Sequence, residues 1–277
     1  MQTLARIRQY LDDRGLSPLK RFGQNFLIDH NLIRKLVDAS GVGPGSLVLE
    51  VGPGTGTMTE ELLERGCEVV ACELDHGLAS LLRDVVGGGV GGGRFTLVEG
   101  DCLASKHALS SELIGAIGNR PFTLVSNLPY GAATPLLTTL LSRHRSCRVM
   151  AVTIQREVAD RLSARPGSRD YGPISVVAQA SATIEHVATL PPECFWPRPD
   201  VTSAMVMLTR LNSPLTDDLE TLELVCRDLF SRRRKQIGWF MSTLTHRPAG
   251  IETTMRPEEL TPPQFVQLAR SRRSMDP

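Results

Sequence analysis

The sequence predicts an α/β fold in which a parallel sheet is flanked by helices and followed by a small helical C-terminal domain. Between residues 30 and 154, short β-rich runs alternate with amphipathic stretches of helical period. Further along the chain, after Leu211, comes a turn at Asn212-Ser213-Pro214, and the pattern after it is helical. The chain has 277 residues, of which 41% are apolar, so it can bury the core of one medium domain with a small appendage.

The first region supplies the elements of the sheet in chain order. Strands are expected at Leu47–Val51, Val69–Cys72, Thr96–Val98, Thr123–Ser126 and Val149–Ile154. Helices are expected near 31–40, 57–65, 76–86 and 134–142. This alternation is typical of a parallel sheet, which binds its ligands at the carboxyl ends of the strands. The glycine-rich stretch Gly87–Gly93 predicts a loop expansion before the third strand.

The C-terminal region shows helix signals of its own. A helical pattern runs from about Thr216 through Thr243, and Thr261 followed by Pro262 is typical of a helix start, with the helix reaching about Arg270. These signals divide the chain into a catalytic domain over residues 1–211 and a helical domain over residues 212–277.

Composition excludes several classes of protein. The first 30 residues carry several charges and no apolar h-region, and no later stretch approaches ~18 uninterrupted apolar residues, so we expect neither export nor membrane insertion. Six scattered cysteines without a Cys-x-x-Cys pair indicate reduced structural thiols of a cytoplasmic protein, and we assign no metal. Cys67 and Cys72 fall in or beside a predicted strand, where buried packing is expected.

Basic and acidic residues are segregated along the chain although the net charge is only +1. Residues 1–35, 141–170 and 225–277 are basic, whereas residues 36–140 carry 5 basic and 12 acidic side chains. One basic block alone is explained by solvated helix faces, but three together favour a polyanion as partner.

A glycine turn follows the first predicted strand. Glu50-Val51-Gly52-Pro53-Gly54-Thr55-Gly56 brings three glycines to a place where backbone can approach a ligand closely. The third glycine comes two residues after the second, whereas the dinucleotide fingerprint needs three, and Glu50 before the turn suits the methionine moiety of a cofactor. The turn therefore favours S-adenosylmethionine over NAD.

Two further acids end the next two strands. Glu73 lies about twenty residues beyond Gly52, where a carboxylate can accept hydrogen bonds from both ribose hydroxyls. Asp101 follows the third strand, where it can accept a hydrogen bond from the adenine amine of the cofactor. Either acid alone is equally well explained as a solvated loop residue. Acids at the ends of three consecutive strands, Glu50 included, instead predict that they surround one cofactor pocket.

The fourth strand ends in Ser126-Asn127-Leu128-Pro129-Tyr130. The Asn127 side-chain oxygen and the Leu128 carbonyl can accept the hydrogens of an adenine N6 amine, turning its delocalised lone pair toward a sulfonium methyl. Tyr130 can stack on the extruded base. Such a stretch alone can be an ordinary turn, because Asn and Pro favour turns for local reasons. Its register with the glycine turn and the strand-end acids favours catalysis.

With these motifs the chain resembles the ribosomal RNA adenine N6-dimethyltransferase family, in the branch that modifies two adjacent adenines near the 3′ end of small-subunit rRNA. The resemblance spans nearly the whole chain. It also rests on these stretches: Arg21-Phe22-Gly23-Gln24-Asn25-Phe26-Leu27, Gln155-Arg156-Glu157-Val158, the motif beginning Tyr171-Gly172, the run from Phe195 to Ala204, and Arg232-Arg233-Arg234-Lys235.

The resemblance implies a Rossmann-like class I methyltransferase sheet with S-adenosylmethionine as cofactor. It implies that Asn25 and Leu27 complete the cofactor site with Gly52, Glu73, Asp101 and Asn127. It also implies that Phe195 faces Tyr130 across the target adenine. The implied partner is small-subunit (16S) rRNA within an assembling ribosomal subunit, bound by a monomer. Arg143, Arg145, Arg148 and the Arg232–Lys235 run are expected to contact phosphates.

The chain departs from the family pattern after the catalytic tyrosine, where Gly131-Ala132-Ala133 replaces the usual Asn-Ile-Ser. This replacement removes none of the chemical groups above but alters the base pocket. Three alternatives stay open: a small-subunit assembly factor with methylation secondary, a large-subunit rRNA adenine N6-methyltransferase, and a DNA adenine methyltransferase. Intact Glu73, Asp101, Asn127 and Tyr130 argue against the first.

Overall fold

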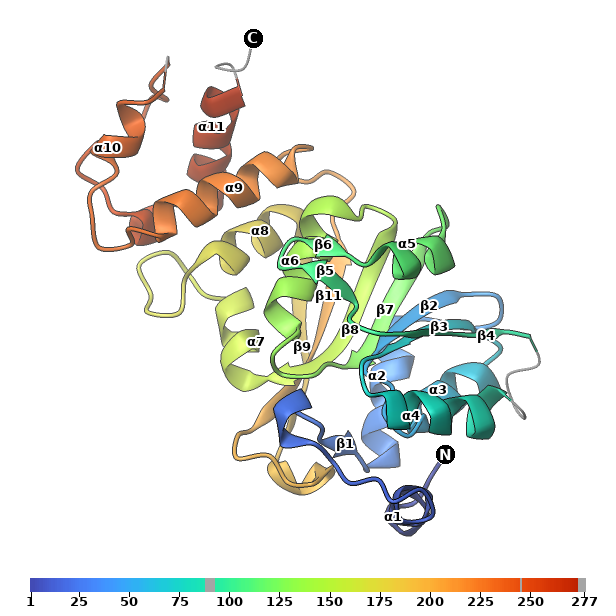
Figure 1. Cartoon of the computed structure of the whole chain (residues 1–277). Helices are drawn as coiled ribbons and strands as arrows, with labels where there is room; N and C mark the ends of the chain where they lie inside the picture. Colours follow the sequence, from blue (N-terminus) through green and yellow to red (C-terminus); the bar gives the residue numbers. More distant parts are fainter. Residues whose placement is uncertain (88–92, 245, 274–277) are drawn as a thin grey trace. The chain divides into compact units, whose positions relative to one another are not determined.

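The computed structural model describes residues 1–87, 93–244 and 246–273 and contains a seven-stranded sheet as its largest element (Figure 1). The expected loop expansion at Gly87–Gly93 lies largely outside the described residues. The strands of this sheet are, from one edge to the other, β4 (Phe95–Glu99), β3 (Glu68–Glu73), β2 (Leu47–Val51), β7 (Phe122–Asn127), β8 (Cys147–Gln155), β11 (Ser203–Arg210) and β9 (Ala182–Leu190).

All five predicted strands are present, and the pairs β4–β3, β3–β2, β2–β7 and β7–β8 are parallel. The α/β class with a mostly parallel sheet is therefore confirmed. The chain moves outward from β2 through β3 to β4 and then returns to place β7 on the other side of β2. That reversal is the switch point at which α/β sheets bind ligands, and it lies between the ends of β2 and β7.

Helices cover both faces of this part of the sheet (Figure 1). On one face, helices α2 (His30–Ser40), α3 (Thr57–Glu64) and α4 (His76–Leu82) bury leucine and isoleucine side chains against β2, β3 and β7. α5 (Ser111–Ile117) packs against β3 and β4 from the opposite face. Aspartate caps start two of these helices: Asp29 accepts from the N–H groups of Asn31 and Leu32, and Asp75 from those of Gly77 and Leu78.

Further elements complete the chain, and several of them were not predicted from the sequence. They are α1 (Leu4–Asp12), η1 (Lys20–Phe22), β1 (Phe26–Leu27), η2 (Arg83–Gly87), β5 (Leu103–Ser105), β6 (Ala108–Leu109), α6 (Ala133–Arg143), α7 (Arg156–Leu162), α8 (Pro173–Ser181), η3 (Pro192–Cys194), β10 (Phe195–Trp196), α9 (Leu219–Phe230), α10 (Gly238–Met241), η4 (Pro257–Glu259) and α11 (Pro262–Arg273). β1 and β10 form a separate antiparallel pair, and so do β5 and β6.

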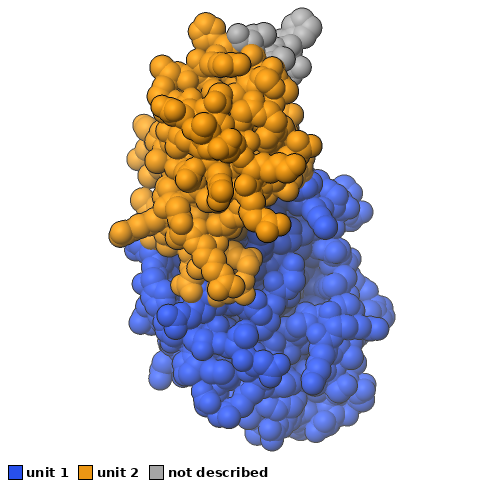
Figure 2. Space-filling model, turned by 90° about the vertical axis from the view of Figure 1, so that its left-hand side faces the viewer, with its two compact units in different colours: residues 1–139, 146–156, 185–208 blue, residues 140–145, 157–184, 209–277 orange. Residues whose placement is uncertain are grey.

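The chain forms two compact units (Figure 2). Unit 1 comprises residues 1–139, 146–156 and 185–208, and unit 2 comprises residues 140–145, 157–184 and 209–277. Unit 2 thus contains the predicted C-terminal helical region together with two earlier segments, because α8 packs against α9 and α11. The helical pattern over 216–243 is split into α9 and α10.

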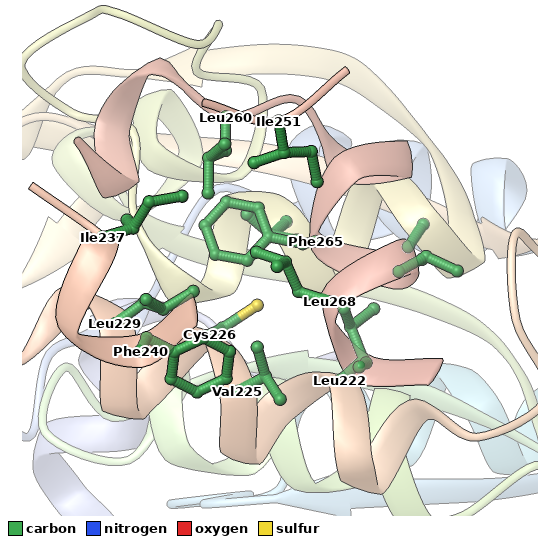
Figure 3. Packing of buried hydrophobic residues seen from close by; sticks show 14 of the residues in the cluster. Leu222, Val225, Cys226, Leu229, Ile237, Phe240, Ile251, Leu260, Phe265 and Leu268 are labelled. Carbon is green, nitrogen blue, oxygen red and sulfur yellow. The ribbon is translucent and has the colours of Figure 1, made fainter. Parts of the chain in front are cut away.

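Unit 2 has its own hydrophobic core, built around Leu229, Cys226 and Phe265 (Figure 3). Phe230 stacks on Phe265 with ring centroids 5.5 Å apart, and the fully buried Tyr171 meets Phe230 edge-on. The Tyr171 hydroxyl donates to the Leu260 carbonyl at 2.9 Å. This bond satisfies a polar group that would otherwise be costly to bury.

Within the described residues, none of the helices combines the length and the hydrophobicity that crossing a bilayer requires. The thiols of Cys67 and Cys72 are buried, as their place in the predicted strand indicated. The part of the chain that the structure describes gathers no group of three or more His, Cys, Asp or Glu side chains placed to hold a metal ion.

Candidate active site

A cavity of about 540 Å³ opens at the carboxyl ends of the parallel strands in unit 1. Its volume lies in the range of small-molecule sites, roughly 300–1,000 Å³. Seven of the nine predicted site residues line it: Asn25, Gly52, Glu73, Asp101, Asn127, Leu128 and Tyr130. The topology explains this gathering, because β2, β3, β4 and β7 all end at the same edge of the sheet.

The glycine turn after β2 is tightly packed, which is why it requires glycine. Gly52 and Gly54 have φ of 71° and 62°, in the left-handed region that other residues adopt only with strain. A Cβ at Gly54 would lie 2.7 Å from Cε1 of Phe26, and one at Gly52 would lie 2.9 Å from Cγ of Pro129. The turn is therefore held between the two other segments that line the cavity.

Glu73 is buried at the end of β3 and ties two turns together. One of its carboxylate oxygens accepts from the Gly54 N–H at 3.0 Å and the other from the Asp75 N–H at 3.0 Å. Burial raises the pKa of Glu73 to about 7, although these hydrogen bonds oppose the shift. Because each carboxylate oxygen can accept more than one hydrogen bond, Glu73 retains capacity for the hydroxyls of a ligand.

Glu50 lies deeper than the sequence suggested. It is 2% exposed, accepts from the Thr59 hydroxyl of α3 at 2.6 Å, and is absent from the described lining of the cavity. Burial raises its pKa to about 8, so the carboxyl is largely protonated at neutral pH. In this structure the Glu50 side chain joins the end of β2 to α3, and it does not line the cavity where the methionine moiety was expected.

Asn127 ends β7 with its carboxamide held in one orientation. Its side-chain nitrogen donates to the Asn25 carbonyl at 2.9 Å, across 102 residues of sequence. Because the nitrogen is used in this way, the oxygen is the end of the carboxamide left to accept a hydrogen from a ligand. The Leu128 N–H is bound by the Thr153 carbonyl of β8 at 3.0 Å, which fixes the backbone that carries the Leu128 carbonyl.

Tyr130 is anchored through its hydroxyl group, which lies 3.2 Å from the Ser203 hydroxyl of β11. Ser203 is fully buried. Burial raises the pKa of Tyr130, although the Ser203 hydrogen bond opposes this shift, so the phenol stays neutral at physiological pH. The ring is thus available for stacking, and the phenol is unsuited to act as a base.

Residues 17–271 match the family model described as "Ribosomal RNA adenine dimethylase". The chain is 39% identical to the "Ribosomal RNA small subunit methyltransferase A" of Magnetococcus marinus over 98% of both chains. It is also 39% identical to the protein of that name from Bifidobacterium longum, over 96% of this chain and 92% of that one.

The chain belongs to the ribosomal RNA adenine dimethylase family. Solved structures agree on the fold. A dimethyladenosine transferase from Plasmodium falciparum is 20% identical, with a TM-score of 0.69 over 88% of this chain and 95% of that one. The 23S rRNA methyltransferase ErmE is 26% identical, with a TM-score of 0.64 over 89% of this chain and 99% of that one. The chain is therefore an S-adenosylmethionine-dependent rRNA methyltransferase with a class I sheet.

The lining of the cavity fits S-adenosylmethionine. Glu73 and Asp101 supply carboxylates at two consecutive strand ends, where ribose hydroxyls and an adenine amine need acceptors. Leu74, Leu78 and Leu103 supply apolar surface nearby. Burial raises the pKa of the lining thiols Cys72 and Cys102 to about 12, so neither adds charge to the site.

Two predicted site residues lie elsewhere. Leu27 and Phe195 are register partners in the β1–β10 pair, and both are buried in the hydrophobic core of unit 1. Phe195 is 2% exposed, and the described lining of the cavity includes neither residue. In this structure Phe195 therefore packs in the core, and its role opposite Tyr130 stays a prediction that requires the ring to leave that position.

The structure also locates Gly131-Ala132-Ala133, where the chain departs from the family pattern. Gly131 and Ala132 line the cavity, and a Cβ at Gly131 would meet nothing within 4 Å. Ala133 is buried at the start of α6. The replacement of larger residues by Gly131 and Ala132 therefore leaves space beside Tyr130.

The structure adds site residues that the sequence argument did not single out. Phe26 packs on the glycine turn and lines the cavity, together with Lys20 and Arg21. Ser203 anchors Tyr130. Phe26 and Ser203 lie within stretches that carry the family resemblance, but their contacts join distant segments, so no local pattern reveals them.

The basic residues expected to contact RNA differ in their exposure and in whether an acidic residue of the chain compensates their charge. Arg143 pairs with the buried Glu223, and Arg145 with Asp217, so both charges are compensated within unit 2. Because Glu223 is buried, the Arg143 pair has a structural role, and contact of Arg143 with phosphate stays a prediction. Arg148 is exposed, and Arg232 lies 4.4 Å from the centre of the Trp239 ring.

Proposed function

We propose that this chain dimethylates the N6 amines of two adjacent adenines in a hairpin near the 3′ end of small-subunit (16S) rRNA. The single observation that carries the proposal is the fixed carboxamide of Asn127, whose nitrogen is bound by Asn25. The relatives named small subunit methyltransferase A support the choice of rRNA. We place the reaction in the cytoplasm, on an assembling subunit, with the enzyme acting as a monomer.

Asn127 and Leu128 act as acceptors in this reaction. The N6 lone pair of adenine is delocalised into the ring, so the amine must be reshaped before it can attack. Hydrogen bonds from N6 to the Asn127 side-chain oxygen and the Leu128 carbonyl favour the geometry in which the lone pair points away from the ring plane. Bound S-adenosylmethionine supplies an electrophilic methyl group on a sulfonium.

Tyr130 holds the base. Its ring stacks on the extruded adenine, and the Ser203 hydroxyl fixes the plane of that ring. A neutral phenol leaves the π-face electron-rich, which suits the positive charge that develops on N6. The space beside Gly131 gives room for the first methyl group while the second is added.

The test is methylation of small subunits that lack the modification, with radiolabelled S-adenosylmethionine and digestion of the RNA to nucleosides. Label in N6,N6-dimethyladenosine is expected for the wild type and is expected to be lost in Asn127→Ala and Tyr130→Ala. Asn119→Ala, at an exposed asparagine outside the cavity, is the matched control. Label absent from wild-type reactions, despite tight subunit binding, would favour an assembly factor.

The same assay tests the two remaining alternatives, a large-subunit rRNA methyltransferase and a DNA adenine methyltransferase. ErmE, a 23S rRNA methyltransferase, shares the fold and 26% identity. Large subunits and adenine-containing DNA are therefore incubated in parallel with small subunits. Transfer that is faster to either of these would overturn the choice of small-subunit rRNA while leaving the adenine chemistry intact.

A further inference from the structure

Three arginines near the start of the chain each lie over an aromatic ring of unit 1. Arg6 lies 5.2 Å from the centre of the Tyr10 ring, Arg8 5.2 Å from that of Trp196, and Arg21 4.8 Å from that of Phe22. Significant pairs of this kind occur about once per 70–80 residues in proteins. Three such arginine–aromatic pairs, all made by arginines within the first 21 residues, are therefore more than a segment of this length would usually contain.

Two of these pairs are connected to the cavity, and Tyr10 of the third packs against the same hydrophobic cluster as Trp196. Arg21 and Phe22 line the cavity. Phe26 also lines it and stacks on Trp196, with ring centroids 6.2 Å apart and an angle of 25° between the planes. Arg8 covers Trp196 in turn. We call Arg6, Tyr10, Arg8, Trp196, Arg21 and Phe22 together the arginine–aromatic surface.

The arginines of this surface are exposed, and one of them also makes a hydrogen bond to its aromatic partner. Arg6 donates from Nε to the Tyr10 hydroxyl at 2.7 Å. Arg14, by contrast, is paired with Asp84 at 3.0 Å and is left out of the surface. Asp12 ends α1 and Asp13 caps it, yet residues 1–35 hold seven basic and three acidic side chains. The excess positive charge favours a polyanion.

The aromatic rings of this surface favour nucleic acid over an acidic peptide as the polyanion. A guanidinium stacked on an aromatic ring presents a flat cation on which a nucleobase can stack, while its free N–H groups reach phosphate. An acidic peptide has no need of such planes. Unpaired bases have exposed faces, whereas those of a duplex are already stacked. The surface thus suits single-stranded RNA.

We propose that the arginine–aromatic surface binds single-stranded nucleotides that adjoin the target adenine, by base stacking and phosphate contacts. This inference rests on the proposed function for the identity of the target. It assigns a role to residues that the methyl-transfer chemistry leaves unused. The surface would hold the flanking strand while one base enters the cavity.

The first measurement is fluorescence anisotropy with a labelled single-stranded RNA of about twelve nucleotides and with the same sequence as a duplex. We expect tighter binding of the single strand. The double variant Arg6→Gln/Arg8→Gln removes two positive charges and two guanidinium planes, so it is expected to weaken single-strand binding at least tenfold. Arg34→Gln is the control, because Arg34 is an exposed arginine of the same basic block that lies 3.9 Å from Glu61 instead of over a ring. We expect it to change binding less than twofold.

The second measurement is the kinetics of methylation of unmodified small subunits. The double variant should raise KM at least fivefold with kcat within twofold and with unchanged affinity for S-adenosylhomocysteine. Wild-type and variant circular dichroism spectra should coincide, since both substituted side chains are exposed.

The outcomes separate this inference from the proposed function. The proposed role of the surface is contradicted if the double variant and Arg34→Gln lose the same affinity for single-stranded RNA. It is also contradicted if the wild type binds single strand and duplex equally tightly. If small subunits gain no dimethyladenosine but single-strand binding still depends on Arg6 and Arg8, the proposed function is contradicted and the proposed role of the surface is supported.

Discussion

Replacing Gly54 by alanine tests the central packing contact of the cofactor turn. Gly54 has φ of 62°, and its added Cβ would lie 2.7 Å and 2.8 Å from two atoms of the Phe26 ring. A left-handed conformation costs a residue other than glycine about 1–2 kcal/mol. Overpacking of a buried contact costs about 1–3 kcal/mol more. The expected loss of unfolding free energy is therefore about 2–5 kcal/mol.

Gly15 provides a matched control. Its φ is 63°, nearly that of Gly54, but a Cβ there would meet nothing within 4 Å. Gly15→Ala should therefore cost only the conformational part, about 1–2 kcal/mol. The effect of alanine on the unfolded chain is common to both variants and cancels in the comparison. The difference between the two variants isolates the clash with Phe26.

The assay is equilibrium unfolding in urea, followed by tryptophan fluorescence. The chain has two tryptophans, with Trp196 in unit 1 and Trp239 in unit 2. In a Trp239→Phe background the signal reports on unit 1 alone. Binding of S-adenosylhomocysteine, measured by calorimetry, should weaken at least tenfold in Gly54→Ala because the hydrogen bond to Glu73 is displaced. If Gly54→Ala and Gly15→Ala agree within about 0.5 kcal/mol and both bind this ligand like the wild type, the packing argument is refuted.

Three further predictions concern other contacts. Because ribose hydroxyls donate to an ionised carboxylate and the pKa of Glu73 is about 7, the affinity for S-adenosylhomocysteine should rise from pH 6 to pH 8 and then level off; a pH-independent affinity in calorimetry would contradict this. Ser203→Ala and Tyr130→Phe remove the same hydrogen bond, so each should lower kcat for methylation several-fold and the double variant should lower it no further, whereas additive losses would argue against the anchor. Tyr171→Phe leaves the Leu260 carbonyl buried without its donor and should cost about 1–3 kcal/mol in urea unfolding; a loss below about 0.5 kcal/mol would show that this acceptor finds another partner.

The sheet and the position of the site were predictable because both follow from local patterns. A β-rich run such as Leu47–Val51 is visible in the sequence, and the helical connections between such runs require parallel pairing. Parallel strands end at one edge, so Gly52, Glu73, Asp101 and Asn127 had to come together. The structure confirms that they line one cavity.

The fate of Leu27 and Phe195 was not predictable in the same way. Both lie in stretches that carry the family resemblance, but they occupy two-residue strands that pair with each other across the chain. Whether such a side chain faces a ligand or the core depends on the register of that pair and on the neighbouring packing. A one-residue change of register would reverse the faces, and no local pattern fixes it.

Sequence alone therefore determined five parallel strands of the sheet, the residues at their ends and the chemistry that those residues offer, whereas β9 and β11 were not predicted. Only the tertiary structure decided how those residues are oriented. The Asn25 carbonyl fixes the amide of Asn127 across 102 residues, and Ser203 anchors Tyr130 across 73. Strand formation depends on side chains a few residues apart, whereas these hydrogen bonds exist only after the sheet has brought distant segments to the same edge.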